Sequence, residues 1–84
     1  GVGIGNSFFV VLRNNKIIDN WYNGLGLSNN IFTKFSFNEI SGNNIGVYVH
    51  QSPVVVPYLN RIDDNDDCNY FVTPFFFPWD FQLG

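Results

Sequence analysis

The sequence predicts an all-β protein, built as an antiparallel sheet or sandwich of short strands. The 84 residues include no alanine and no methionine, and Glu39 is the only glutamate, so helix-favouring residues are scarce. Phenylalanine, valine and isoleucine are abundant, and these side chains fit a pleated, half-buried surface. Thirteen asparagines and eight glycines supply turns.

The first third of the chain reads as an arm followed by a hairpin. Residues 1–6 (GVGIGN) are interpreted as a glycine-rich arm, because no strand precedes them and no helix follows, as a phosphate-binding loop would require. The apolar run at 7–13 predicts a strand, and residues 16–22 predict its return strand. Asn14-Asn15 would form the tight turn between them.

The middle of the chain predicts a second hairpin. Residues 23–30 (NGLGLSNN) have the composition of a turn, and residues 31–40 and 45–51 alternate apolar and polar side chains as half-buried strands do. A short loop between these two strands would set Phe37 beside Val49 and keep the apolar side chains on one face.

The last third predicts an edge strand at 52–60, because its two prolines cannot donate to a central ladder. Residues 61–69 read as an acidic loop, and a short strand at 69–73 follows. Residues 70–82 form an aromatic segment. We interpret residues 1–84 as a single β domain or a fragment of a larger β domain.

Charge and hydropathy exclude two classes of partner. The net charge is −3 with four cationic residues, which does not support a nucleic-acid surface. No apolar run reaches the roughly 20 residues that a membrane-spanning helix needs. The chain also lacks a catalytic motif: His50 is expected to be a hydrogen-bonded structural residue, and Cys68 lies among aspartates that disfavour a thiolate. We expect no enzymatic activity and no cofactor.

One pattern suggests a cation site. Asp63, Asn65 and Asp67 have the spacing of the first side-chain ligands of a calcium loop. Cys68 then stands where that loop has glycine, and Pro74 where it has its bidentate glutamate. The competing interpretation is a solvated loop of repelling charges, and we favour that one.

The aromatic segment is the strongest functional signal in the sequence. A small sheet cannot cover this many rings, and exposed apolar patches mark interaction surfaces. We therefore predict a self-assembling structural protein, in contact with copies of itself or other chains of an assembly. Two alternatives are that the rings form the domain's own core, or that they belong to a secreted β module that recognises a carbohydrate or protein. The predicted interface consists of Tyr70, Phe71, Phe75, Phe76, Phe77, Trp79 and Phe81.

The order of motifs resembles the first part of parvovirus capsid proteins. Gly-Val-Gly stands at 1–3, NNIFTK at 29–34, and an acidic stretch precedes Tyr-Phe-x-Thr-Pro-aromatic and Asp-Phe-amide within 66–82. The resemblance implies a jelly roll in which residues 7–22 contain the first core strand and Thr73-Pro74 forms a corner. It also implies a subunit of an icosahedral shell around single-stranded DNA. Phe75 departs from the tryptophan usual in that family, and 84 residues span less than half of an eight-stranded roll.

Overall fold

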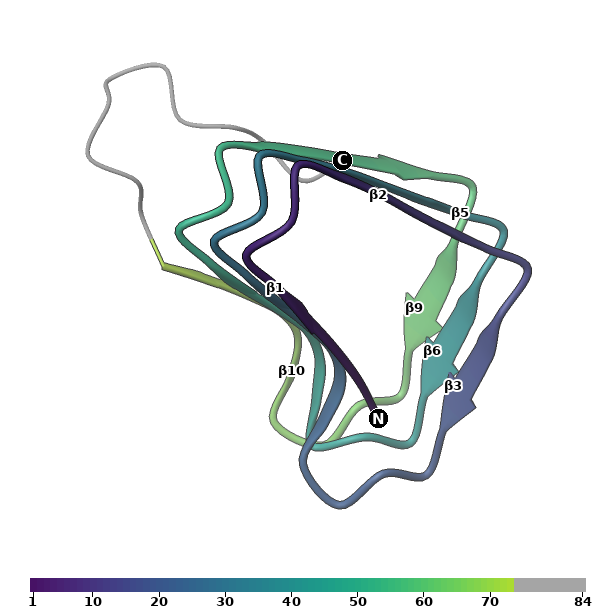
Figure 1. Cartoon of the computed structure of the whole chain (residues 1–84). Helices are drawn as coiled ribbons and strands as arrows, with labels where there is room; N and C mark the ends of the chain where they lie inside the picture. The colour runs from purple at the N-terminus through teal and green to yellow at the C-terminus, as the bar shows by residue number, and fades with distance from the viewer. Residues whose placement is uncertain (74–84) are drawn as a thin grey trace.

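The chain winds into a β-solenoid, a stack of coils in which every strand pairs with its neighbours in parallel. The computed structural model describes residues 1–73, and these form ten strands and no helix. Each complete coil gives one strand to each of three sheets, so the cross-section has three sides when viewed along the stack (Figure 1).

The three sheets are named here A, B and C. Sheet A consists of β1 (Val2–Gly5), β4 (Asn23–Ser28), β7 (Ile45–His50) and β10 (Cys68–Thr73). Sheet B consists of β2 (Phe9–Arg13), β5 (Phe32–Ser36) and β8 (Val54–Tyr58). Sheet C consists of β3 (Lys16–Ile18), β6 (Glu39–Ser41) and β9 (Arg61–Asp63).

The register of the sheets shows an internal repeat. Val2 pairs with Leu25 and Leu25 with Val47, which are separations of 23 and 22 residues. Sheet C follows the same spacing, since Ile17, Ile40 and Ile62 form one row. A coil of this kind cannot bury its apolar side chains alone, so each coil is stabilised by stacking on the next.

Apolar side chains from all three sheets fill the inside of the coils. Phe35 from sheet B, Ile40 from sheet C and Leu25 and Val47 from sheet A are fully buried. Thr33 is the exception, because it lies buried between Val10 and Val55 in its row, and its hydroxyl has no hydrogen-bond partner within residues 1–73.

The chain turns each corner with one residue at positive φ, followed by an inward-facing polar residue. Asparagine and glycine adopt this conformation at little cost, whereas bulky side chains adopt it rarely. The positive-φ residues at the three corners are Asn6, Asn29 and Gln51, then Asn14, Phe37 and Leu59, then Asp19, Gly42 and Asp64.

The inward polar residues that follow form ladders along the stack. Asn43 is the clearest example: its Oδ1 accepts from the backbone N–H and the side-chain amide of Asn20 at 3.0 and 2.8 Å. Its Nδ2 donates to the carbonyl of Ile17 and to Oδ1 of Asn65, both at 3.1 Å. Each such asparagine therefore satisfies polar groups of two neighbouring coils, as buried backbone at a corner requires.

The expectation of β structure is confirmed, but the antiparallel arrangement is wrong. Leu12 pairs with Phe35 of the next coil, so Asn14-Asn15 turns a corner and does not close a hairpin. Phe37 likewise follows β5 at a corner, while Val49 pairs with Leu27 and Val72 in sheet A. Strands that succeed one another along the chain belong to different sheets, which excludes the sandwich and the jelly roll for these residues.

Three segments that lacked a predicted strand contain one. Residues 1–6 include β1 and residues 23–30 include β4, although both are rich in glycine. Residues 61–69 begin with β9 and end within β10. The glycines misled the interpretation because an isolated strand is weakened by them, whereas here the neighbouring coil on each side supplies the pairing.

Candidate functional site

The outer surface of sheet B and its flanking corners carries a continuous set of exposed apolar side chains, called here the apolar face. Its rings contact one another: Phe9 stacks on Phe32 at 5.0 Å between ring centroids, and Phe37 meets Tyr58 edge to face at 5.9 Å. The members of the apolar face are Phe8, Phe9, Val11, Ile31, Phe32, Phe37, Val54, Val56, Tyr58 and Leu59.

Two cationic side chains lie on the same surface. Lys34 is in register between Val11 and Val56, near the middle of the apolar face. Arg13 lies towards its border, with its guanidinium 5.7 Å from the centre of the Phe37 ring. The face has no acidic side chain among the outward residues of its three strands.

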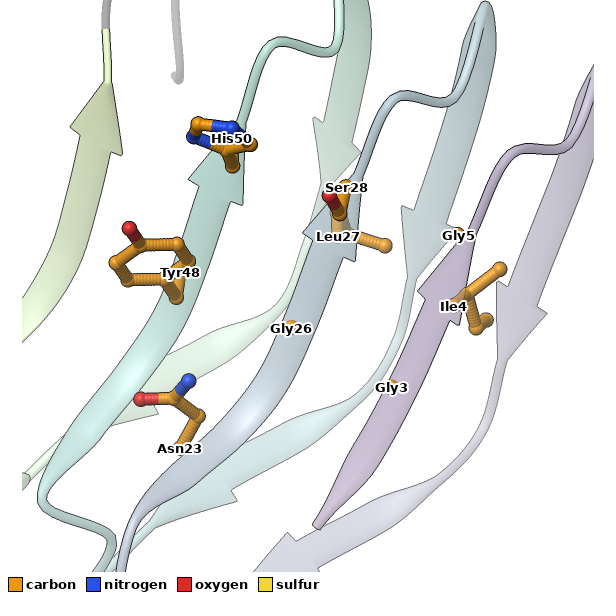
Figure 2. A pocket seen from close by; sticks show the side chains of 9 residues that line it. All are labelled: Gly3, Ile4, Gly5, Asn23, Gly26, Leu27, Ser28, Tyr48 and His50. Carbon is orange, nitrogen blue, oxygen red and sulfur yellow. The ribbon is translucent and has the colours of Figure 1, made fainter.

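The outer surface of sheet A has a different shape, because it is hollowed by a groove of about 460 Å³. Figure 2 shows the groove running across β1, β4 and β7. In the first two coils its floor is glycine backbone, and in the third coil Tyr48 rises beside it. The lining residues are Gly3, Ile4, Gly5, Asn23, Gly26, Leu27, Ser28, Tyr48 and His50.

Glycine is not required sterically at the two central floor positions. A Cβ atom added to Gly26 would meet nothing closer than 3.9 Å, and one added to Gly3 would meet nothing within 4 Å. The corner glycines differ, since a Cβ on Gly24 would lie 2.6 Å from Nδ2 of Asn43 and one on Gly46 would lie 2.6 Å from the carbonyl oxygen of Asn69. Gly24 and Gly46 therefore serve the packing of the coils, whereas Gly3 and Gly26 leave the groove open.

An aromatic stack borders the groove. The rings of Tyr48 and Phe71 lie face to face, 5.3 Å apart and 3° from parallel. Phe71 belongs to the coil after Tyr48, and Gly26 to the coil before it. One face of the Tyr48 ring is therefore covered by Phe71, and the opposite face is turned towards the side on which Gly26 lies.

Polar groups line the same groove. Nδ1 of His50 lies 2.9 Å from Oγ1 of Thr73, whose hydroxyl donates to the carbonyl of Val49 at 3.3 Å. Because that hydroxyl has only one proton, we assign the Nδ1–H tautomer to neutral His50, which leaves a lone pair on Nε2. Ser28, beside His50 in register, accepts from Nδ2 of Asn29 and keeps its own proton for donation.

Asn23 adds an unpaired group at this site. Its Oδ1 is buried and has no hydrogen-bond partner within residues 1–73. The groove thus combines an aromatic ring, a hydroxyl, an imidazole and an amide, without a charged side chain at neutral pH when His50 is uncharged.

The predicted aromatic interface is divided by the fold. Phe71 faces outward and is 46% exposed, as an interface residue would be. Tyr70 faces inward and packs against the core, and this burial raises the pKa of its hydroxyl. The remaining predicted residues lie outside the described part of the chain: Phe75, Phe76, Phe77, Trp79 and Phe81.

The calcium-like pattern does not gather its ligands. Asn65 is a ladder residue that accepts from Asn43 and donates to the carbonyl of Ile40. Asp63 forms an ion pair with Arg61 at 3.2 Å, and that hydrogen bond raises the pKa of the Arg61 guanidinium. Within residues 1–73 no three acidic, histidine or cysteine side chains come together as a metal site would need.

Two further sequence predictions have a structural outcome. His50 is hydrogen-bonded to Thr73, as expected, and also borders the groove, which the sequence alone did not indicate. Cys68 is a half-buried free thiol at the start of β10. In the region that the structure covers, no helix could span a membrane.

Both surfaces depend on the coil register, so reading the sequence locally could not find them. The apolar face appears only when 9–13, 32–36 and 54–58 are aligned with one another. Comparisons with protein-family models, with curated proteins and with solved structures find no match.

Proposed function

We propose that this chain is a structural, self-assembling β protein in which the apolar face packs against the same face of a second copy. The observation that carries the proposal is the size of this face. Four aromatic rings bury about 150–250 Å² each when covered, so even at half exposure they offer roughly 400 Å² before the aliphatic side chains are added. The largest patch on a typical monomer is about 300–600 Å² in total.

Backbone strain within the apolar face supports the same proposal. Phe37 and Leu59 have φ of 55° and 52°, at the corner where the first coil has Asn14. A bulky residue in this region costs about 1–2 kcal/mol relative to an ordinary conformation. Strain of this kind concentrates at functional sites, and at this corner it adds two large apolar side chains to the exposed surface.

A second copy fits this face better than an unrelated partner of strong charge. The surface is nearly neutral apart from Lys34 and Arg13, and a flat sheet can stack on its own symmetry mate at about 10 Å. The stem of Lys34 adds apolar surface, and its ammonium group can extend to the edge of the contact. Lys34 nonetheless opposes tight association, because the two-fold mates would bring like charges together.

A viral shell subunit is one form that such an assembly could take. That form depends on the Gly-Val-Gly and Thr-Pro motifs alone, and the parallel coils of residues 2–73 are unlike the antiparallel roll that the resemblance implies. We therefore propose self-assembly without carrying the capsid identity forward.

The test is sedimentation of the full chain over a range of concentrations. We expect a reversible monomer–dimer equilibrium that weakens at least about tenfold in a Phe9→Ser, Phe32→Ser double variant, as truncation of central aromatic residues typically does. Trp21→Ser is the matched control, because Trp21 is 97% exposed but lies outside the apolar face. A wild-type chain that stays monomeric, or a control that weakens equally, would refute the proposal.

Phe37→Asn gives a second readout with two opposite signs. Asparagine matches Asn14 at the equivalent corner and relieves the positive-φ strain, so the monomer should become more stable, while the dimer should weaken because a ring is lost from the face. A variant that dimerises as well as the wild type would show that this corner is not part of the contact.

A further inference from the structure

The groove on sheet A is separate from the apolar face, because the two surfaces lie on different sides of the coil (Figure 1). Its aromatic and polar groups do not contribute to the proposed self-association. Its open floor also needs its own explanation, since Gly3 and Gly26 weaken their strands without relieving any close contact.

The aromatic stack defines the space beside it. Tyr48 and Phe71 stack because neighbouring coils place their rings in register. Continuing this stack by one coil would require a ring at Gly26, where the chain has no side chain. The vacant position lies one strand spacing from Tyr48, about 4.7–4.9 Å, which is within the range of roughly 4.5–7 Å over which rings stack.

We propose that the groove binds a neutral oligosaccharide, with one pyranose ring seated over Gly26 against the free face of Tyr48. The C–H face of a sugar ring is weakly positive and is attracted to the negative face of an aromatic ring. The ring would take the position that a third aromatic residue would otherwise fill in the stack.

The polar groups of the groove favour a sugar over a flat aromatic ligand. A pyranose carries hydroxyl groups around its rim, and each can donate and accept. Ser28 offers a proton and Nε2 of His50 offers a lone pair, and both lie in the row next to that of Tyr48 and Gly26. An apolar ring would leave these groups unused, and specific sites lose affinity when polar groups are left unpaired.

The charge of the lining favours a neutral ligand. None of the nine lining residues is acidic or basic apart from His50, so a charged sugar would gain no ion pair there. The groove crosses several strands and is open along its length (Figure 2), which suits a chain of sugar rings.

The experiment is a titration of the isotope-labelled full chain with cellotetraose, a neutral chain of glucose rings, followed by NMR. We expect shifts of the amides of Gly3, Gly26 and Ser28, with a dissociation constant no weaker than about 10 mM. Tyr48→Leu should weaken binding about two- to tenfold, the range expected for loss of one aromatic contact. Gly26→Tyr should abolish it, because the new ring would occupy the proposed sugar position, and the backbone has room for a side chain there.

The control variant is Phe9→Ser, which alters the apolar face and should leave sugar binding unchanged. Failure of self-association and failure of sugar binding are thereby distinguished. The proposal is overturned if neither cellotetraose nor its α-linked counterpart maltotetraose shifts these amides, or if binding survives Gly26→Tyr. Tighter binding of indole or adenosine in the same groove would also overturn it, because the site would then select a flat aromatic ring.

Discussion

The inside and the outside of this solenoid differ in how closely the coils resemble one another. Inward positions keep the same kind of residue from coil to coil, as in the row Ile17, Ile40 and Ile62 or the ladder Asn20, Asn43 and Asn65. Outward positions change, so that one row of sheet A reads Gly3, Gly26, Tyr48 and Phe71. Stacking constrains the inward residues, whereas the outward residues are free to form binding surfaces.

The sharpest way to break the inward pattern is to remove a ladder residue. Asn43→Ala deletes the partner of two groups of Asn20, of the Ile17 carbonyl and of Asn65. Buried groups left unpaired cost about 1–3 kcal/mol each, so we expect a loss of roughly 3–5 kcal/mol in the free energy of unfolding. Urea denaturation followed by circular dichroism would measure it.

The neighbouring residue provides the control for this variant. The Asn44 side chain makes no hydrogen bond within the described residues, so Asn44→Ala should change stability by no more than about 0.5 kcal/mol. Equal losses in the two variants would mean that the ladder is not what holds the corner.

Two glycines one strand position apart test the inside against the outside directly. Gly24→Ala places a methyl group 2.6 Å from Nδ2 of Asn43 and 2.7 Å from the carbonyl oxygen of Gly46, and overpacking of this kind costs about 1–3 kcal/mol. Gly26→Ala has space, and a strand is stabilised by about 0.5–1 kcal/mol when alanine replaces glycine. Midpoints of urea unfolding that shift in the same direction would contradict the distinction.

Thr33 is an inward position that departs from its row, and Thr33→Val should restore the pattern. Valine stands at both register neighbours, Val10 and Val55, and the buried Thr33 hydroxyl has no partner within residues 1–73. We expect a gain of about 1 kcal/mol in thermal or urea unfolding. Thr73→Val is the matched control and should lower stability, since the Thr73 hydroxyl bonds to Val49 and His50.

Part of this inside pattern could be predicted from the sequence. The apolar runs at 7–13 and 45–51 contain β2 and β7, because local β propensity is strong there. The direction of pairing could not be predicted from the same local signals, since Asn14-Asn15 suits a hairpin turn as well as a coil corner. The available signal was the recurrence of asparagine, at 15, 38 and 60 and again at 20, 43 and 65, with intervals of 23 and 22 residues.

The outside surfaces were less accessible to sequence reasoning. Exposed aromatic surface was predicted and exists in the described residues, but the rings at Phe9, Phe32 and Tyr58 carry it, and each looked like part of a core strand. The groove depends on Gly26 and Tyr48 being in register although they are 22 residues apart. No local pattern contains that relationship.

Tyr70 gives the smallest expected effect and tests whether its ring belongs to the inside. Burial raises the pKa of the Tyr70 hydroxyl above its ordinary value of 10.0, so the folded state favours the neutral form. The associated stability is present below pH 10 and is lost as the pH rises through the folded-state pKa. Tyr70→Phe cannot ionise, so its unfolding midpoint should fall less than that of the wild type between about pH 8 and pH 11. The other tyrosines ionise in both proteins, and parallel losses would therefore assign the whole pH dependence to them and place the Tyr70 hydroxyl in solvent.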